Sequence, residues 1–330
     1  MPEIFRGTAP GKIVLWGEYA VLADAPAAVL AIDRRAVCTI APRKSGFCLH
    51  TLGFASPDIE LSSLQIDQVP AAAILFAHAA SALTQPLPNG LDITLDTADF
   101  HRQQEKLGIG SSAAALVACY GAMCALTGEE ASLDRAISAH RAFQGSGSGL
   151  DVAAAMTGGV IRFQSGQARP MELPKNLHFA FVFSGKGVAT GRQLGSFSRW
   201  RQQGNTRVLQ VLADAASSLF DCIAPATTST STPSITTKVQ WETYIEALQQ
   251  LDTIAELGIY NDAHRQLERL SRSLGLVYKP CGAGGGDVGM AIGFNADDHA
   301  LLNQFAQLCD THGFMPLDLT GTPHGLHVEQ

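Results

Sequence analysis

In the first half of the chain, apolar residues form short runs that predict strands, separated by longer stretches with helical spacing. Leu91–Leu95 alternates apolar with polar side chains, the period-two pattern of a half-buried strand. Ser111–Thr127 is rich in alanine, begins with two serines and ends before Gly128, so it has both a helix start and a helix stop signal. Ser132–Phe143 predicts a second helix. Further short apolar runs predict strands at Ile13–Trp16, Ala27–Ile32, Ala36–Ile40, Val160–Phe163 and His178–Phe183.

The second half is more helical. Apolar residues recur every three or four positions in three segments, which predicts helices at Val208–Phe220, Lys238–Leu257 and Asp297–His312. Ala224–Thr237 contains nine serines or threonines among fourteen residues and cannot bury enough apolar surface to fold alone. We expect this segment to be a mobile surface loop rather than a domain boundary, because helical pattern continues on both sides of it.

The length of 330 residues is about twice that of a typical domain, which favours two domains. We place the domain boundary near residues 165–176, in the polar stretch Gln164–Pro170. We therefore expect domains at residues 1–170 and 171–330.

Composition excludes several classes of protein. Hydrophobic residues make up 46% and charged residues 16%, which is typical of a globular chain. The net charge of −7, without any large Lys/Arg cluster, argues against nucleic-acid binding. The longest apolar-rich stretch, Val69–Leu83, is too short to span a bilayer. Seven scattered cysteines without a C-x-x-C pair fit free thiols, so we expect a cytoplasmic protein with no membrane partner.

Glycine is the unusual component, because many of the 32 glycines fall in four short bursts. The first burst, Pro10–Ala20, places Lys12 at the start of an apolar strand that ends in a Gly-Glu turn. This arrangement can hold an ammonium at the edge of a site. The alternative is a solvated lysine beside a strand.

The second burst, Lys106–Ala115, runs from glycines directly into a helix. Glycines let the backbone approach an anion closely, and the free N–H groups and dipole of a helix N-terminus favour phosphate. The hydroxyls of Ser111 and Ser112 can bind phosphate or Mg²⁺, and Lys106 adds a positive charge. An ordinary capped helix needs only one serine, so we favour phosphate binding. The Gly-Lys-Ser/Thr ending of a Walker A loop is missing.

The third burst, Gln144–Asp151, places a carboxylate just past a flexible glycine segment. There Asp151 can accept a proton from a substrate hydroxyl, or it can simply cap the following small-residue helix.

The fourth burst, Pro280–Asp287, has three consecutive glycines before the predicted strand Val288–Ile292. Such a run is costly in chain entropy unless the backbone must bend tightly or pack against a ligand, and a plain hairpin turn needs fewer glycines.

Together the bursts resemble the GHMP kinase family of small-molecule kinases. Pro10–Ala20 is similar to the family's first motif, Gly108–Ala114 to its ATP-phosphate loop, and Gly282–Gly286 to its third motif. The resemblance implies an α+β, two-domain GHMP kinase fold, with an N-terminal ribosomal S5-like domain and a C-terminal ferredoxin-like domain. The active site is then expected between the two domains.

Within the family, these segments are most similar to the subfamily that phosphorylates phosphomevalonate to diphosphomevalonate. Mevalonate kinases typically have a Mg²⁺-binding glutamate eleven residues before the equivalent of Asp151, and this chain has His140 there. The resemblance leaves two alternatives, a mevalonate kinase and a non-catalytic binding protein with the same fold. The second predicts loss of Lys12, Ser112 or Asp151, and all three are present.

The resemblance also implies roles for individual residues, with ATP and Mg²⁺ as cofactors and a small phosphorylated molecule as substrate. Lys12 and Asp151 are the expected catalytic residues, and Ser112 is the expected metal ligand. The nucleotide phosphates are expected on Lys106, Gly108, Gly110, Ser111, Ser112 and Ala113. The substrate is expected on His140, Gly147, Ser148, Lys186, Thr190, Arg192, Gly284 and Gly285, with Arg199 and Arg201 as further candidates for its anionic groups.

Overall fold

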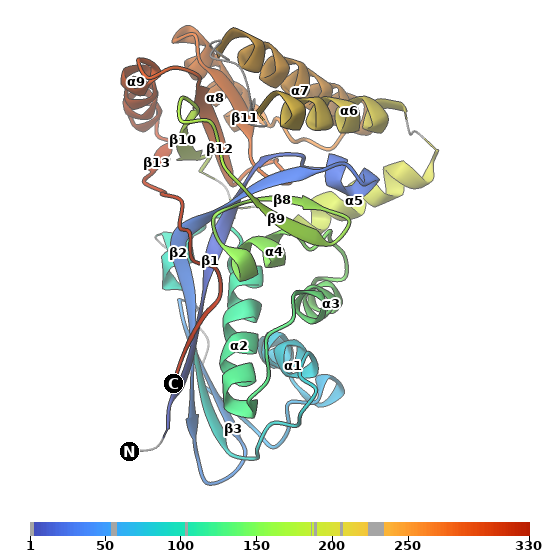
Figure 1. Ribbon diagram of the computed structural model, residues 1–330, viewed down its shortest axis with the longest axis vertical. Helices are drawn as coiled ribbons and strands as arrows, with labels where there is room; N and C mark the ends of the chain where they lie inside the picture. Colours follow the sequence, from blue (N-terminus) through green and yellow to red (C-terminus); the bar gives the residue numbers. More distant parts are fainter. Residues whose placement is uncertain are drawn as a thin grey trace.

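The computed structural model contains two main β-sheets, and helices pack against each of them (Figure 1). The structure describes residues 3–53, 58–102, 105–185, 187, 190–204, 207–223 and 234–330.

The larger sheet is built mainly from the first half of the chain. Its strands lie in the order β14-β1-β2-β5-β3-β4, with β8 and then β9 added beside β2. Neighbouring strands are antiparallel except β3 and β5, which are parallel. The strands are β1 (Phe5–Trp16), β2 (Ala27–Pro42), β3 (Phe47–Leu52), β4 (Ile59–Leu61), β5 (Leu91–Asp96), β8 (Val160–Gln164), β9 (Gln167–Met171) and β14 (His327–Glu329).

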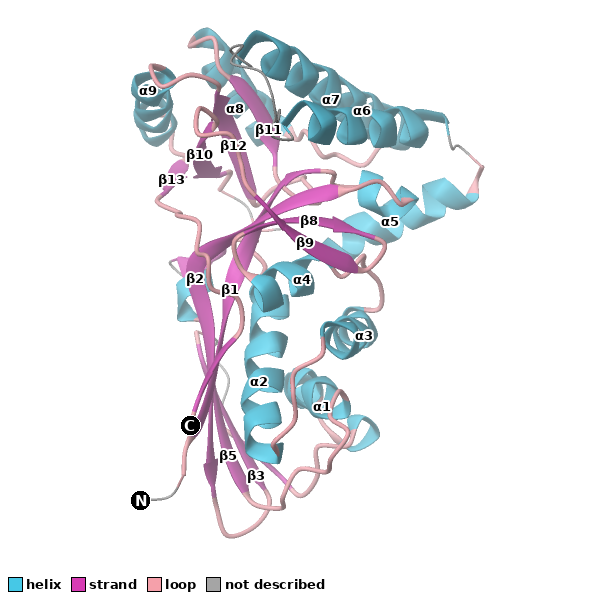
Figure 2. Ribbon diagram, in the orientation of Figure 1, coloured by secondary structure: helices cyan, strands magenta, loops and turns pink. Residues whose placement is uncertain are grey.

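Four helices lie together on one side of this sheet (Figure 2). They are α1 (Ile74–Ser81), α2 (Ser111–Thr127), α3 (Leu133–Gln144) and α4 (Leu150–Thr157). Most of α2 is buried, because its alanines can pack closely on every side. Gly7 in β1 permits this contact, since a Cβ atom there would lie only 2.2 Å from the carbonyl oxygen of Ala118.

The smaller sheet has the order β11-β12-β10-β13, and its strands are all antiparallel. They are β10 (His178–Phe183), β11 (Val277–Pro280), β12 (Val288–Gly293) and β13 (Met315–Leu317). Helices α8 (Asp262–Ser273) and α9 (Asp298–Thr311) pack against this sheet and enclose a separate small core that includes Val182, Leu267 and Phe305.

Three more helices complete the second half, α5 (Thr190–Gln202), α6 (Arg207–Ile223) and α7 (Ser234–Ala255). Trp16 at the end of β1 packs its ring 4.7 Å from Phe220 of α6 and 5.4 Å from Trp241 of α7. These aromatic contacts join the two halves of the molecule. The shorter elements are the 3₁₀ turns Ala20–Ala23, Ile66–Gln68, Ala71–Ala73 and Ala98–Phe100 and the strands β6 (His101–Arg102) and β7 (Glu105–Lys106).

The end of the chain returns to the larger sheet. After β13 it runs back along β2, where Gly321 bridges Ile32, and then β14 pairs with β1 (Figure 1). The expected boundary at residue 170 falls within β9, and the chain enters the smaller sheet at β10. The segment 171–330 therefore includes a strand that belongs to the first sheet.

The expected α+β class is confirmed, and differences from the expected elements are local. Ala27–Ile32 and Ala36–Ile40 form one strand, because β2 pairs with β1 on both sides of an irregularity at Asp33 and Arg34, where the register shifts between Pro10 and Gly11. No pattern in the sequence led us to expect helices α1, α5 or α8. Residues 224–233 of the expected loop lie outside the described residues, and its last four residues are helical, with Thr237 buried in α7.

Two other expectations concern the cysteines and the membrane. All seven cysteines are free thiols, as expected. In the part of the chain that the structure describes, no helix combines the length and apolar character needed to cross a bilayer.

Candidate active site

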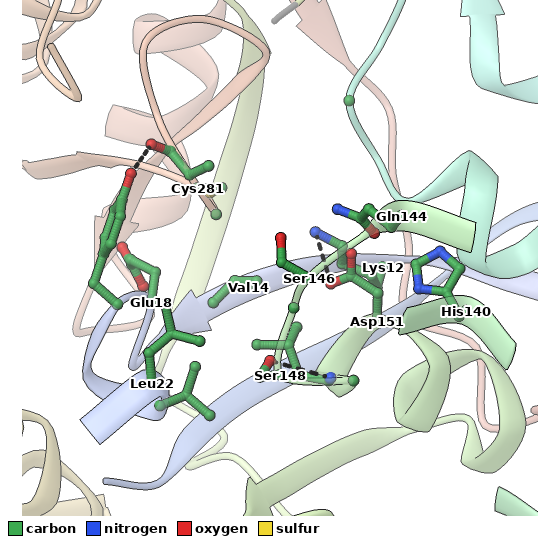
Figure 3. Close-up of a pocket in the computed structure, with 18 of the residues that line it drawn as sticks. Lys12, Val14, Glu18, Leu22, His140, Gln144, Ser146, Ser148, Asp151 and Cys281 are labelled. Atoms are coloured by element: carbon green, nitrogen blue, oxygen red, sulfur yellow. Dashed lines mark hydrogen bonds and ion pairs between the residues drawn. The ribbon is translucent and has the colours of Figure 1, made fainter. Parts of the chain in front are cut away.

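A cavity opens where β1, the third glycine burst and the fourth glycine burst meet (Figure 3). Lys12 and Asp151 lie on one side of it, and Glu18, Leu22 and Cys281 lie on the other. The glycine bursts that are far apart in the sequence therefore surround one space.

Lys12 and Asp151 form an ion pair, with 3.2 Å between Nζ and Oδ1. Their side chains are 11% and 26% exposed, so both charges are largely shielded but remain accessible from the cavity. Asp151 lies in the first turn of α4, whose N-cap is Gly149 at φ +94°. The carboxylate therefore faces Lys12 and does not cap the helix.

The second burst forms the turn that starts α2. Gly108 and Gly110 have φ values of +73° and +88°, which favour glycine, and Gly110 is the N-cap. A Cβ atom at Gly110 would lie 3.0 Å from Cγ of Lys12, so this turn packs directly on the catalytic lysine candidate. The N–H of Lys12 also donates to the Ile109 carbonyl at 2.9 Å. The helix N-terminus, a suitable place for phosphate, is thus fixed beside the Lys12–Asp151 pair.

Lys106 lies just before this turn. Its side chain is exposed along much of its length, yet desolvation by the protein around it lowers its pKa, while the carboxylates of Asp287 and Asp151 act in the opposite direction.

Asp287, the last residue of the fourth burst, packs onto Gly108. A Cβ atom at Gly108 would lie 2.1 Å from Cγ and 2.4 Å from Cβ of Asp287. The phosphate-loop candidate and the fourth burst are therefore in direct contact, and only glycine allows this approach.

We expect Gly108→Ala to weaken ATP binding at least about 10-fold and to lower the free energy of unfolding by about 1–3 kcal/mol beyond the backbone strain. Gly128→Ala is a matched control, because Gly128 has φ +72° at the other end of α2 and open space around it. Nucleotide titration and urea unfolding measure the two effects. Equal losses in both variants would show that the contact with Asp287 is unimportant.

His140 and Ser112 meet beside the same turn, with 3.3 Å between Nε2 and Oγ. Burial lowers the pKa of His140, and the two nearby lysines add to this while Asp151 opposes it. Nε2 of a neutral ring can accept a hydrogen bond from the Ser112 hydroxyl, and the lone pairs of the hydroxyl oxygen then remain free to bind a cation. The Ser112 and Asp151 oxygens are the kind of ligand that Mg²⁺ prefers, so these residues fit the expected metal.

Four consecutive carbonyl groups of the fourth burst, those of residues 283–286, are hydrogen-bonded to side chains from other parts of the fold. Tyr19 Oη donates to Ala283 at 2.7 Å, Gln193 Nε2 to Gly284 at 3.3 Å and Asn261 Nδ2 to Gly285 at 2.7 Å. His264 Nε2 lies 2.8 Å from the Gly286 carbonyl, and burial lowers the pKa of His264 to about 4, so its ring is neutral at pH 7. These bonds hold the loop rigidly against the cavity.

The turn after β1 connects this rigid loop to the larger sheet. The Gly17 N–H donates to Tyr244 Oη in α7 at 2.8 Å, and Glu18 Oε1 lies 2.6 Å from Lys279 Nζ in β11. Both charged side chains are almost fully buried. Burial raises the pKa of Glu18, and the Lys279 ammonium opposes that rise. The Gly17-Glu18-Tyr19 turn thus contacts α7, β11 and the fourth burst.

The predicted substrate residues are placed differently from one another. His140, Gly147 and Ser148 line the cavity. Gly284 and Gly285 do not, because they pack against Ile259 and Gln193.

The other predicted substrate residues lie at or near the start of α5. Lys186 lies outside the described residues, and only the backbone of Thr190 and Arg192, at the start of α5, is described. Arg199 is exposed and donates to Ser196 Oγ, and Arg201 donates to the Leu22 carbonyl at 2.6 Å.

Glu18 and Arg141 also line the cavity, although neither was expected as a site residue from the sequence. Glu18 had a usable signal in the Gly-Glu turn after an apolar strand. Arg141 had a weaker one, since it directly follows His140 in the helix that leads into the third burst.

Comparisons with known proteins agree with this geometry. The family model for the GHMP kinases N terminal domain matches residues 71–159. The chain is 26% identical to the phosphomevalonate kinase of Streptomyces sp. (strain CL190), over 96% of this chain and 97% of that protein. It is 24% identical to the mevalonate kinase of Pyrococcus horikoshii, over 100% and 99%. Its fold matches Streptococcus pneumoniae phosphomevalonate kinase, solved with phosphomevalonate and AMPPNP, at a TM-score of 0.74 and 19% identity, over 96% and 99%.

Proposed function

Because this chain belongs to the GHMP kinase family, we propose that it is an ATP-dependent small-molecule kinase that converts phosphomevalonate to diphosphomevalonate. The observation that carries the proposal is the Lys12–Asp151 ion pair beside the glycine turn that begins α2. The similarity to a phosphomevalonate kinase over nearly the whole chain supports the choice of acceptor. We propose the cytoplasm as its compartment, where ATP is available and thiols stay reduced.

In the proposed reaction, an oxygen of the acceptor phosphate attacks the γ-phosphorus of ATP. The new P–O bond forms as the bond to the β–γ bridging oxygen breaks, and ADP leaves with that electron pair. An acceptor phosphate is already ionised at neutral pH, so no strong base is needed. Catalysis then depends on positioning and on stabilisation of charge.

Each residue near the pair has a task in this mechanism. The turn at Gly108–Ser112 and the N-terminus of α2 hold the nucleotide phosphates. Lys12 stabilises charge on the phosphoryl group in transfer, and Asp151 orients the acceptor and keeps Lys12 in place. Ser112 and Asp151 would hold Mg²⁺, which supplies charge neutralisation on the phosphates when it is bound.

Phosphorylation of mevalonate is a second candidate activity, favoured by the 24% identity to an archaeal mevalonate kinase over the whole chain. In that reaction the acceptor is a neutral hydroxyl, so Asp151 would have to remove its proton. His140, where mevalonate kinases typically have glutamate, favours the first activity.

We expect ADP release with phosphomevalonate to exceed release with mevalonate in parallel coupled assays with ATP and Mg²⁺. Asp151→Asn protein purified in the same way is the control for contaminating kinases. Faster release with mevalonate would reverse the choice of acceptor. No release with phosphomevalonate, mevalonate, galactose or homoserine would favour a non-catalytic binding protein.

A further inference from the structure

Arg141 is a second permanent cation among the described residues that line the cavity, after Lys12. It lies in the last turn of α3, directly after His140. Lys12 is already paired with Asp151, and the carboxylate of Glu18 is paired with Lys279. A substrate with two anionic groups therefore needs a further positive charge in this space.

The guanidinium of Arg141 is fixed by the third glycine burst. Its Nε donates to the Gly147 carbonyl at 3.0 Å, and its Nη2 donates to the Ser148 carbonyl at 2.5 Å. Both partners are neutral, so these bonds orient the guanidinium without cancelling its charge. The same loop leads into Asp151, three residues after Ser148, which ties the position of the cation to that of the catalytic carboxylate.

Some arginines in the described part of the chain pair with carboxylates, whereas others, such as Arg201 and Arg265, donate to backbone carbonyls outside the cavity lining. Arg43, Arg135 and Arg272 have ion pairs of 2.8–2.9 Å with Glu60, Glu129 and Glu268. Within the described residues Arg141 has no ion pair of this kind. A guanidinium has five N–H donors, and the two carbonyls take two of them. The remaining three can make the forked contact that arginine forms with carboxylate or phosphate.

We propose that Arg141 binds an anionic group of the acceptor and makes the cavity specific for doubly anionic substrates. This inference rests on the proposed kinase function. Carboxylate and phosphate share the forked chemistry, and an acceptor such as phosphomevalonate carries both groups. The cation is held in advance by the glycine loop, so little side-chain freedom is lost when the acceptor binds.

The first experiment is steady-state kinetics on Arg141→Met, Arg141→Lys and Arg141→Gln. We expect Arg141→Met to raise the KM for phosphomevalonate about 10- to 100-fold, with the KM for ATP and kcat changed less than about 3-fold. Lysine keeps the charge and should recover part of the loss. Glutamine keeps a donor for the loop carbonyls but no charge, and should recover little.

Arg169→Met is the matched control, because Arg169 is an exposed arginine in β9 outside the cavity lining. A KM rise shared by mevalonate would assign Arg141 to the carboxylate that both acceptors carry. A rise confined to phosphomevalonate would assign it to the acceptor phosphate. The proposal would be overturned if the KM for the acceptor did not change, or if only the KM for ATP rose. It would also be overturned if Arg141→Met lowered kcat and Arg141→Gln restored full activity.

A second measurement separates this proposal from the choice of acceptor. With ADP saturating, inorganic phosphate should raise the Tm of the wild-type protein, and Arg141→Met should abolish this rise while Arg169→Met keeps it. A rise equal in all three proteins would overturn the role of Arg141. If inorganic phosphate raises the Tm only when Arg141 is present, but the protein does not turn over phosphomevalonate, then only the proposed acceptor is rejected.

Discussion

Replacing Asp151 by asparagine is expected to lower kcat by at least about 10²-fold while the affinity for ADP changes less than about 3-fold. Asparagine has nearly the same shape, but it removes the charge that holds Lys12 at 3.2 Å. Gly108 and Gly110 of the nucleotide turn pack on Asp287 and Lys12, and asparagine leaves this packing in place, so nucleotide binding should persist. Steady-state ADP release and calorimetric titration with ADP measure the two quantities separately.

The partner residue gives a stricter version of the same test. If Lys12 and Asp151 act as one unit, Lys12→Met should cost a similar factor, and the double variant should lose little more than either single one. Asp134→Asn is the control, since Asp134 is an exposed carboxylate in the first turn of the neighbouring helix α3. Unchanged turnover in Asp151→Asn, or losses that simply multiply in the double variant, would contradict the paired role.

The second large effect is on stability. Glu18→Gln or Lys279→Met should each lower the free energy of unfolding by about 3–5 kcal/mol, because each leaves a buried charge without its partner. The two side chains are 3% and 0% exposed, so water cannot replace the lost contact. Urea unfolding followed by tryptophan fluorescence is a suitable measurement, since Trp16 and Trp241 pack together at the same junction.

The double variant Glu18→Gln/Lys279→Met distinguishes a lost ion pair from general damage. It buries no unpaired charge, so we expect it to be more stable than either single variant. Arg6→Met breaks an ion pair whose side chains are 46% and 50% exposed, and it should cost at most about 1 kcal/mol. A double variant as unstable as the sum of the single ones would show that the two charges act independently.

Local signals explain which parts of this fold were predictable. The bounds of α2 follow directly from its two serines and its terminal glycine, and β10 follows from its uninterrupted apolar run. The polar helix α8 was missed because arginine and glutamate fill most of its positions, and only a few residues such as Leu267 face the core. The two expected strands within β2 are one strand because pairing with β1 resumes after the irregularity at Asp33 and Arg34, which the local sequence does not indicate.

The site was predictable where glycine marks a close approach. The bursts around Gly108 and Gly149 indicated the turns that begin α2 and α4, and both turns lie beside Lys12 or its partner. Gly284 was expected in the cavity only because it belongs to a glycine burst. In the structure Gly284 packs on Ile259, which lies between α7 and α8, and the sequence of the burst does not indicate this contact. Arg141 was missed because an arginine near a helix end is usually solvated, and its bond to the Gly147 carbonyl depends on how the glycine turn after α3 is bent.

The pairing of β14 with β1 has a consequence for how the protein is made. Arg6 and Glu329 are neighbours in the sheet but are separated by 323 positions in the chain. At roughly 5–20 residues per second, about a quarter of a minute to a minute passes on the ribosome before β1 can meet this partner. During that interval the edge of β1 that β14 later covers is open to pairing with other chains, so we expect the nascent protein to be most prone to aggregation before β14 emerges.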